Sequence, residues 1–394
     1  MLTNFSFRRN HPRPSARAFA ATVFAFALFV PAAAEAQTYT FTNLGVPSGY
    51  TSSLGYGVNS TGQVTGTYDA NGTGYAFLSG PNGGALQNAG GLGGGVNNGL
   101  TYGNGINAAG QVTGYSLALD GSYHAYLTGP NGGPTHDLGL PPNVSNSYGN
   151  GVNASGQVTG LVNKTTGSRA FLSGPNGGPL HELATFGGQD TSGLAVNDSG
   201  QVTGTSDTAA GFSHAFLSDA NGGALQDLGT LGGRISEGTA LNANGQVAGF
   251  SYTLNDSATH AFLFSGGSMI DLGTLLGGFK SVANGIDAAG NVVGVSGTSS
   301  GQHAFLFTNG AITDLNTLIA PNLGYTLVAA NGISANGYIT GYCKNSAGIY
   351  SAYLLTPNSP VPEASSVIPF GLLLVLGLSG MVVAAKRRKS SAAA

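Results

Sequence analysis

The sequence predicts an all-β fold, a seven-bladed β-propeller. A short pattern, G-Q-V-x-G and its variants, starts at seven glycines: Gly62, Gly110, Gly156, Gly200, Gly245, Gly290 and Gly337. Their spacings of 48, 46, 44, 45, 45 and 47 residues define a unit of about 46 residues that fills positions 37–356. Glycine supplies 67 of the 394 residues, which suits a chain with many turns. Four short strands at such a period are the signature of a propeller blade.

Each unit is expected to contain four antiparallel strands, A to D. In the fourth copy strand A ends at 195–197, and strands B, C and D occupy 201–204, 214–217 and 225–228. Asn197 suits an Asx turn between strands A and B, and Gly200 suits a positive φ in that turn. The Asn-Gly pair at 221–222 indicates a hairpin between strands C and D.

The spacing between two further patterns obeys strand parity. An H-A-F-L string and a later D-L-G string are 13 residues apart in four copies, as from His214 to Asp227, and 11 apart in two, as from His260 to Asp271. Removing two residues at a hairpin keeps every side chain on its face of the sheet, whereas removing one would reverse them all. The two strings are therefore expected on paired strands.

The ends of the repeat region predict a closed ring. The seventh copy stops at 351–355 without a strand D, and the segment 38–44 resembles an isolated strand D. We expect 38–44 to pair with 353–355, which would complete the seventh blade and remove the exposed sheet edges. The alternatives are an open β solenoid and two stacked half-rings.

Residues 1–36 have the pattern of a secretory signal peptide. Four arginines precede an apolar run at 18–30, and Ala34-Glu35-Ala36 forms an A-x-A cleavage site before Gln37. We expect the secretion machinery to recognise this segment and cleavage to follow Ala36.

The other end predicts a membrane anchor. An apolar run at 367–385 would reach about 28 Å as a helix, close to one hydrocarbon thickness. The cluster Lys386, Arg387, Arg388 and Lys389 begins a basic tail at 386–394 and is expected to stop transfer and stay cytoplasmic. A linker at 357–366 contains Val361, Pro362 and Glu363, followed by Ala364.

Two family resemblances follow from these residues. The Val361-Pro362-Glu363 motif, the apolar run and the basic end resemble the PEP-CTERM sorting signal of bacterial exported proteins, although Ala364 replaces the usual second proline. That resemblance implies cleavage by a sorting protease, an exosortase, after a stage anchored in the inner membrane, and transfer to the cell surface or extracellular matrix. A plain single-pass anchor is the alternative. The H-A-F strings resemble the HAF repeat of bacterial extracellular proteins, which implies an extracellular setting and no particular activity.

Charge and cysteine content exclude several classes of function. Residues 37–360 hold 5 Lys or Arg against 14 Asp or Glu, a net charge of −9, which disfavours anionic partners and nucleic acid. The single cysteine, Cys343, excludes an internal disulfide framework and a multi-cysteine metal site, and it is expected to be a buried or half-buried small residue.

The repeated histidines are predicted to be structural. Each would lie on a third strand, roughly 9–10 Å outward from the innermost one, so histidines of different blades could not converge on one ion. We expect His124, His214, His260 and His303 to bond the D-L-G strand, which carries Asp137, Asp227, Asp271 and Asp314, or the next blade. No catalytic, cofactor-binding or metal-binding residue is predicted.

The variable segments are the B–C loops, which share one face of the ring with the D–A connections. Binding residues usually lie on variable loops over a rigid scaffold, so this face is the expected contact surface, although neutral drift of the loops would look the same. The sixteen tyrosines could stack on sugars, whereas the absence of tryptophan weakens a lectin interpretation.

The predicted function is that of an exported, monomeric repeat protein of the cell surface or matrix. It would act as a non-enzymatic binding or scaffold module, with exopolysaccharide or a surface glycan as partner. One alternative is a propeller lyase or hydrolase acting on polysaccharide, which would need carboxylates gathered at the channel mouth. Another is a purely structural repeat without a specific ligand.

Overall fold

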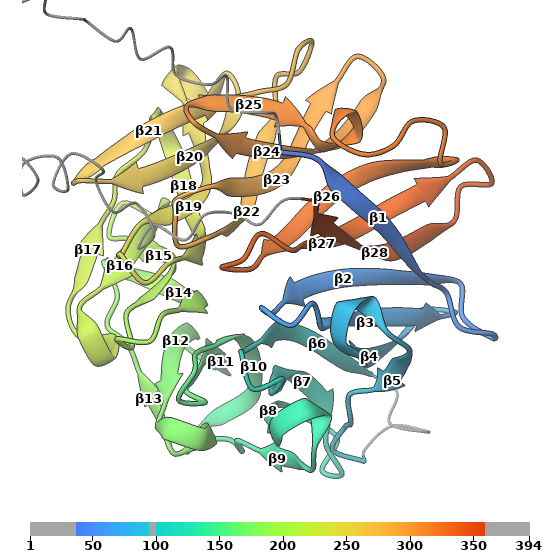
Figure 1. The fold of residues 1–394 in the computed structure, drawn as a ribbon. Coiled ribbons are helices and arrows are strands. Elements are labelled where there is room, and N and C mark those ends of the chain that lie inside the picture. Colours follow the sequence, from blue (N-terminus) through green and yellow to red (C-terminus); the bar gives the residue numbers. More distant parts are fainter. Residues whose placement is uncertain (1–36, 94–99, 359–394) are drawn as a thin grey trace, which may run out of the picture. The chain divides into compact units, whose positions relative to one another are not determined.

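The computed structural model describes residues 37–93 and 100–358, which form seven four-stranded antiparallel sheets. Each sheet contacts the next, and the seventh contacts the first, so that the sheets form a ring (Figure 1). The predicted seven-bladed β-propeller is therefore confirmed.

Six sheets are continuous in sequence. The first holds β2 (Ser52–Val58), β3 (Val64–Ala70), β4 (Thr73–Ser79) and β5 (Leu86–Asn88). The second holds β6 (Thr101–Ile106), β7 (Val112–Leu117), β8 (Tyr123–Thr128) and β9 (Thr135–Asp137), and the third holds β10 (Val144–Val152), β11 (Val158–Lys164), β12 (Gly167–Ser173) and β13 (Leu180–Glu182). The fourth holds β14 (Gly187–Val196), β15 (Val202–Thr208), β16 (Ser213–Ser218) and β17 (Leu225–Asp227). The fifth holds β18 (Gly232–Leu241), β19 (Val247–Thr253), β20 (Thr259–Ser265) and β21 (Ser268–Gly273), and the sixth holds β22 (Ser281–Ile286), β23 (Val292–Thr298), β24 (Gly301–Thr308) and β25 (Ala311–Asp314).

Short 3-10 turns connect some of these strands. Those between the third and fourth strands of the first four sheets are η1 (Pro81–Gly83), η3 (Pro130–Gly132), η4 (Pro175–Gly177) and η5 (Ala220–Gly222). Two others, η6 (Leu254–Asp256) and η7 (Leu315–Thr317), lie in loops of the fifth and sixth sheets. The fifth sheet instead turns tightly at Gly266-Gly267. Tyr126 nevertheless pairs with Asp137 and Phe262 with Asp271, so the two-residue difference preserves the register, as strand parity predicts.

The seventh sheet closes the ring with the beginning of the described chain. It holds β26 (Tyr325–Ile333), β27 (Ile339–Asn345), β28 (Tyr350–Pro357) and β1 (Tyr39–Gly45). Phe41 pairs with Leu355 in an antiparallel ladder, and Figure 1 shows β1 in blue beside β28 in red. The predicted closure is confirmed, and the open alternatives are wrong.

The H-A-F string packs each sheet against the next. Its aromatic residue is fully buried in every copy, at Phe77, Tyr126, Phe171, Phe216, Phe262, Phe305 and Tyr353. The small alanine allows the following sheet to approach, and a serine of that sheet's inner strand accepts the alanine N–H. These bonds join Ala125 to Ser147, Ala215 to Ser236, Ala261 to Ser281 and, across the closure, Ala352 to Ser53.

The last glycine of the G-Q-V-x-G pattern is required by a close approach within the sheet. A Cβ atom at Gly114 would overlap the carbonyl oxygen of Tyr102 on the neighbouring inner strand, and the equivalent glycines meet the same obstacle. The pattern's first glycine has a different role, because Gly200 has a φ of +70° in the predicted turn. Asn197 Oδ1 accepts the N–H groups of Ser199 and Gln201 in that turn, which forms the expected Asx turn.

Several predicted features lie outside the described residues. These are the signal peptide with Ala34 and Ala36, the motif Val361-Pro362-Glu363, the apolar run 367–385 and the basic tail 386–394. Within the described residues, no helix has the length and hydropathy needed to cross a bilayer.

Candidate functional site: the central channel and the loop face

The ring has two chemically different faces. The A–B and C–D turns lie on one, called here the turn face. The B–C loops and the D–A connections between successive sheets lie on the other, called the loop face.

Exposed apolar side chains gather on the loop face. Nine large apolar residues are exposed in the part of the chain that the structure describes, and eight belong to B–C loops, to D–A connections or to the strand end beside them. These eight are Leu119, Phe212, Leu254, Leu276, Phe279, Leu323, Ile349 and Tyr350. Leu276 and Phe279, with exposed fractions of 97% and 80%, are the most extreme pair within one connection. The eight residues are distributed over several loops around the ring, with two close pairs at Leu276/Phe279 and Ile349/Tyr350.

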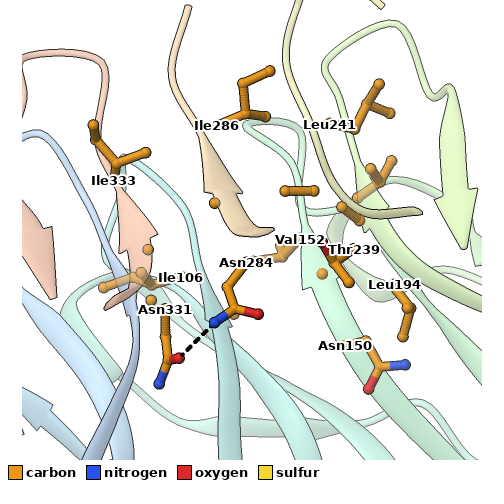
Figure 2. A pocket seen from close by; sticks show the side chains of 18 of the residues that line it. Ile106, Asn150, Val152, Leu194, Thr239, Leu241, Asn284, Ile286, Asn331 and Ile333 are labelled. Carbon is orange, nitrogen blue, oxygen red and sulfur yellow. Dashed lines mark hydrogen bonds between the residues drawn. The ribbon is translucent and has the colours of Figure 1, made fainter. Parts of the chain in front are cut away.

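The inner strands surround a central channel of about 200 Å³ (Figure 2). Its wall consists of equivalent short segments from all seven sheets, such as Asn150–Val152, Leu194–Val196 and Asn284–Ile286. Among the described residues that line it, none carries an ionisable side chain. The described residues that line this space, which are the inner-strand ends next to the A–B turns, therefore supply no acid, base or charged nucleophile.

Polar side chains at the channel hold neighbouring sheets together. Each inner strand has a β-bulge, and in five copies the bulged side chain donates a hydrogen bond to a carbonyl oxygen of the next sheet. The donors are Asn104, Asn150, Thr239, Asn284 and Asn331, and the acceptors are Gly149, Gly193, Ala283, Ala330 and Gly55. Asn284 also donates to the side chain of Asn331 at 3.2 Å, the dashed line in Figure 2. The bond from Asn331 to Gly55 crosses the closure.

A second series of inter-sheet bonds lies at the turn face. The Asx-turn asparagines of the first five copies are buried, and each donates its side-chain N–H to the backbone carbonyl of the equivalent residue in the next copy. The donors are Asn59, Asn107, Asn153, Asn197 and Asn242. Uniform turn residues therefore maintain the ring, which explains why they repeat.

The repeated histidines bond the outer strand of their own sheet. The Nδ1 atoms of His124, His214 and His260 lie 2.9 Å from the carboxylates of Asp137, Asp227 and Asp271, and the distance from His303 to Asp314 is 2.6 Å. Because a carboxylate only accepts hydrogen bonds, Nδ1 carries the proton.

The residue at the repeated aspartate position changes when the histidine changes. Tyr75 and Ser351 replace the histidine in two copies, and Asn88 and Asn43 then replace the aspartate. These asparagines still accept the N–H of Gly90 and Gly45, as Asp227 accepts that of Gly229. The acidic position therefore caps the turn after the outer strand in all these copies, and carries a negative charge in the histidine copies.

Other ionisable groups are dispersed. Within 37–93 and 100–358, no three His, Cys, Asp or Glu residues lie close enough together to share a metal ion. Burial raises the pKa of Glu237, on the inner strand β18. Cys343 is buried as expected; burial raises the pKa of its thiol, and a hydrogen bond with Ser351 partly offsets that effect.

Four half-buried tyrosines form a cluster that the sequence analysis did not locate. Tyr102, Tyr115 and Tyr123 come from the second sheet and Tyr148 from the third. The ring centroids of Tyr102 and Tyr115 are 4.6 Å apart, those of Tyr115 and Tyr148 4.9 Å, and those of Tyr123 and Tyr148 6.0 Å. We call these four residues the tyrosine cluster. A similar pair, Tyr342 and Tyr350, lies at the positions of Tyr115 and Tyr123 in the seventh sheet, but among the described residues the four-ring arrangement across two sheets is found only here.

Comparisons with known proteins identify the fold class and no family. No protein-family model matches the chain, and no curated protein matches it. Among solved structures, an acylaminoacyl peptidase bound to Z-Gly-Gly-Phe-chloromethyl ketone is 8% identical with a TM-score of 0.50, over 82% of this chain and 52% of that one. A streptogramin B lyase is 12% identical with a TM-score of 0.47, over 82% and 98%. TolB from Acinetobacter baumannii is 13% identical with a TM-score of 0.44, over 81% and 66%. Such identities show the propeller fold alone.

Proposed function

We propose that this chain is an exported protein of the cell surface or extracellular matrix, and that its propeller is a non-enzymatic module that binds polysaccharide or surface glycan. The channel chemistry carries this proposal. In an enzyme of this fold that cleaves polysaccharide, ionisable groups would converge at the channel mouth. Here the described lining residues are aliphatic residues, glycines, asparagines and one threonine, and the polar ones already bond the next sheet.

The loop face supports the binding role. Its loops carry eight of the nine exposed large apolar residues of the described chain, whereas the turn face carries none of them. All five basic residues of 37–358, Lys164, Arg169, Arg234, Lys280 and Lys344, also lie in its loops or at the adjoining strand ends. Two of them are already paired with carboxylates there, Lys164 with Glu182 and Arg234 with Asp256.

A binding and product assay tests the proposal. The purified full-length protein would be incubated with polysaccharides, and its retention by the polysaccharide and the release of new reducing or unsaturated ends would be measured in the same samples. We expect retention without depolymerisation. Time-dependent accumulation of shortened chains would overturn the non-enzymatic assignment.

Export is tested separately by the mature termini. Intact-mass analysis of the native protein should give an N-terminus at Gln37, as expected from the Ala34-Glu35-Ala36 site. Loss of the chain beyond Val361-Pro362-Glu363 would support recognition by a sorting protease, and retention of that segment would favour a plain anchor. An uncleaved N-terminus in a cytoplasmic fraction would contradict the proposed localisation.

A further inference from the structure

We propose that the tyrosine cluster is the binding site of the module and that it takes a neutral oligosaccharide. This inference rests on the proposed function and adds to it a place and a class of ligand. Tyr102, Tyr115, Tyr123 and Tyr148 are half-buried, so each leaves part of its side chain exposed. Tyr102 and Tyr123 lie at the loop-face ends of β6 and β8, whereas Tyr115 and Tyr148 lie nearer the middle of β7 and β10.

The fold itself does not require these tyrosines. Tyr102 pairs across β6 and β7 with Tyr115, and the corresponding pair in the fourth sheet is Ser192 and Thr205. The position of Tyr123, at the start of the third strand, is held by Ser213 in the fourth sheet. Because that sheet forms the same four-stranded structure with small hydroxyl residues, the second sheet's aromatic residues serve something other than the blade.

The geometry of the rings favours a hydroxylated ligand over an organic cation. A cage for an ammonium group needs open space between ring faces. Here the rings of Tyr102 and Tyr115 stack at 4.6 Å with an interplanar angle of 22°, and the ring of Tyr148 meets that of Tyr115 at 74°. The rings fill the space between them and direct edges and hydroxyl groups outward. An amphipathic aromatic surface of this kind suits the alternating C–H and O–H groups of a sugar.

Three of the four hydroxyl groups are available to hydrogen-bond a ligand. Within the described residues, the hydroxyls of Tyr115, Tyr123 and Tyr148 neither donate to nor accept from another residue. Burial raises the pKa of Tyr115, and the neighbouring tyrosines raise it further, which indicates that the phenol groups lie close together and remain protonated. The side chain of Asn146 lies beside them, where its oxygen accepts the backbone N–H of Tyr123.

The local charge argues against an acidic glycan. Burial is the main cause of the raised pKa of Tyr102, and the Tyr123 hydroxyl and the Asp69 carboxylate contribute, so a negative charge lies close by. Asp120 adds a second carboxylate at the B–C loop that precedes Tyr123. The nearest basic residue along the third sheet, Lys164, is bound by Glu182 at 2.6 Å. A neutral chain of sugars pays no electrostatic penalty here, whereas a polyuronate would be repelled.

The test uses residues that the chain itself places at equivalent positions. A triple variant, Tyr102→Ser, Tyr115→Thr and Tyr123→Ser, reproduces the fourth sheet. The matched control is Phe250→Thr, which changes the position equivalent to Tyr115 in the fifth sheet, outside the cluster. Tyr123→Phe keeps the ring and removes one hydroxyl group. Because the chain has no tryptophan, its fluorescence comes from its 16 tyrosines, four of which form the cluster.

Full-length proteins would be titrated with neutral hexasaccharides of glucose, mannose, xylose and N-acetylglucosamine, and with polygalacturonate as the anionic probe. We expect at least one neutral probe to bind, the triple variant to weaken it at least tenfold, Tyr123→Phe to weaken it severalfold, and Phe250→Thr to leave it unchanged. A triple variant that keeps its denaturation midpoint and binds like the wild type would overturn this site, as would preferential binding of polygalacturonate or binding of no neutral probe. Product analysis of the same samples tests the proposed function independently. Depolymerisation would refute the non-enzymatic function whether or not the tyrosine cluster binds the oligosaccharide.

Discussion

The turn face and the loop face of the ring are built from the same seven copies, yet they differ in what repeats. On the turn face, the Asx-turn asparagine and its inter-sheet bond recur in five successive copies. On the loop face, equivalent positions hold tyrosine in one sheet and serine or threonine in another. Residues that repeat therefore maintain the ring, and residues that differ between copies are free to determine what the ring contacts.

Removing the closing strand should have the largest effect on stability. A variant that lacks 38–45 loses the pairing of Phe41 with Leu355, exposes the edge of β28 and uncovers the core around Tyr353. We expect a loss of more than about 5 kcal/mol, comparable with the whole stability of many domains. Chemical denaturation of this variant would be compared with that of a chain beginning at Gln37. Similar midpoints would mean that the ring does not depend on closure.

Two phenylalanines four residues apart compare the interior with the loop face. Phe216 is 0% exposed between the third and fourth sheets, whereas Phe212 is 36% exposed in the adjoining B–C loop. Phe216→Ala should cost about 3–5 kcal/mol, because it removes a large side chain from a packed core. Phe212→Ala should change the free energy of unfolding by less than about 0.5 kcal/mol. Equal losses in urea denaturation would contradict the division between ring-maintaining and copy-specific residues.

The repeats predicted the architecture because each copy confirms the others. Seven copies, the C–D register and the closure all follow from spacing and strand parity. The spacing did not explain why particular residue types occupy the repeated positions, because that depends on contacts that the folded chain makes. Gly114 is small because the Tyr102 carbonyl oxygen lies beside it, and the alanine of H-A-F is small because the next sheet's serine bonds its N–H.

The tyrosine cluster escaped sequence analysis for a related reason. Tyr115 and Tyr148 belong to different copies, and the arrangement occurs at one place in the ring, so no periodicity marks it. Residue counts could indicate that tyrosines were available, but only the packing of the second sheet against the third brings these four together.

An amide from each face gives a finer comparison. Asn197 is buried at the turn face; it accepts the N–H groups of Ser199 and Gln201 and donates to the carbonyl of Asn242. Asn197→Ala leaves these buried groups unpaired and should cost about 2 kcal/mol. Gln302 is exposed at the loop-face end of β24, and Gln302→Ala should cost less than about 0.5 kcal/mol. The difference would be measured as a shift in denaturation midpoint at unchanged m-value. A cost at Gln302 that matched the cost at Asn197 would show that the loop face also holds the ring together.

A smaller effect than at Asn197 is expected at the outer edge, where the histidines lie between the two faces. His214 donates to the Asp227 carboxylate at 2.9 Å, but 23% of the His214 side chain and 43% of the Asp227 side chain are exposed, so solvent competes for the bond. His214→Ala should therefore cost less than about 1 kcal/mol. Asp227→Ala should cost more, about 1–2 kcal/mol, because Asp227 also accepts the N–H of Gly229 at the turn.

A double-mutant cycle separates the two roles of Asp227. If the aspartate acts mainly as the cap of the turn, Asp227→Asn should be nearly neutral in a His214→Ala background. That background resembles the seventh sheet, where Ser351 takes the histidine position and Asn43 takes the aspartate position. The same substitution in the presence of His214 should be unfavourable, because an amide can direct a second N–H toward the ring nitrogen. A coupling energy indistinguishable from zero would mean that the matched changes of the two positions reflect something other than their hydrogen bond. The histidine would then be no more constrained than the loop-face residues beside it.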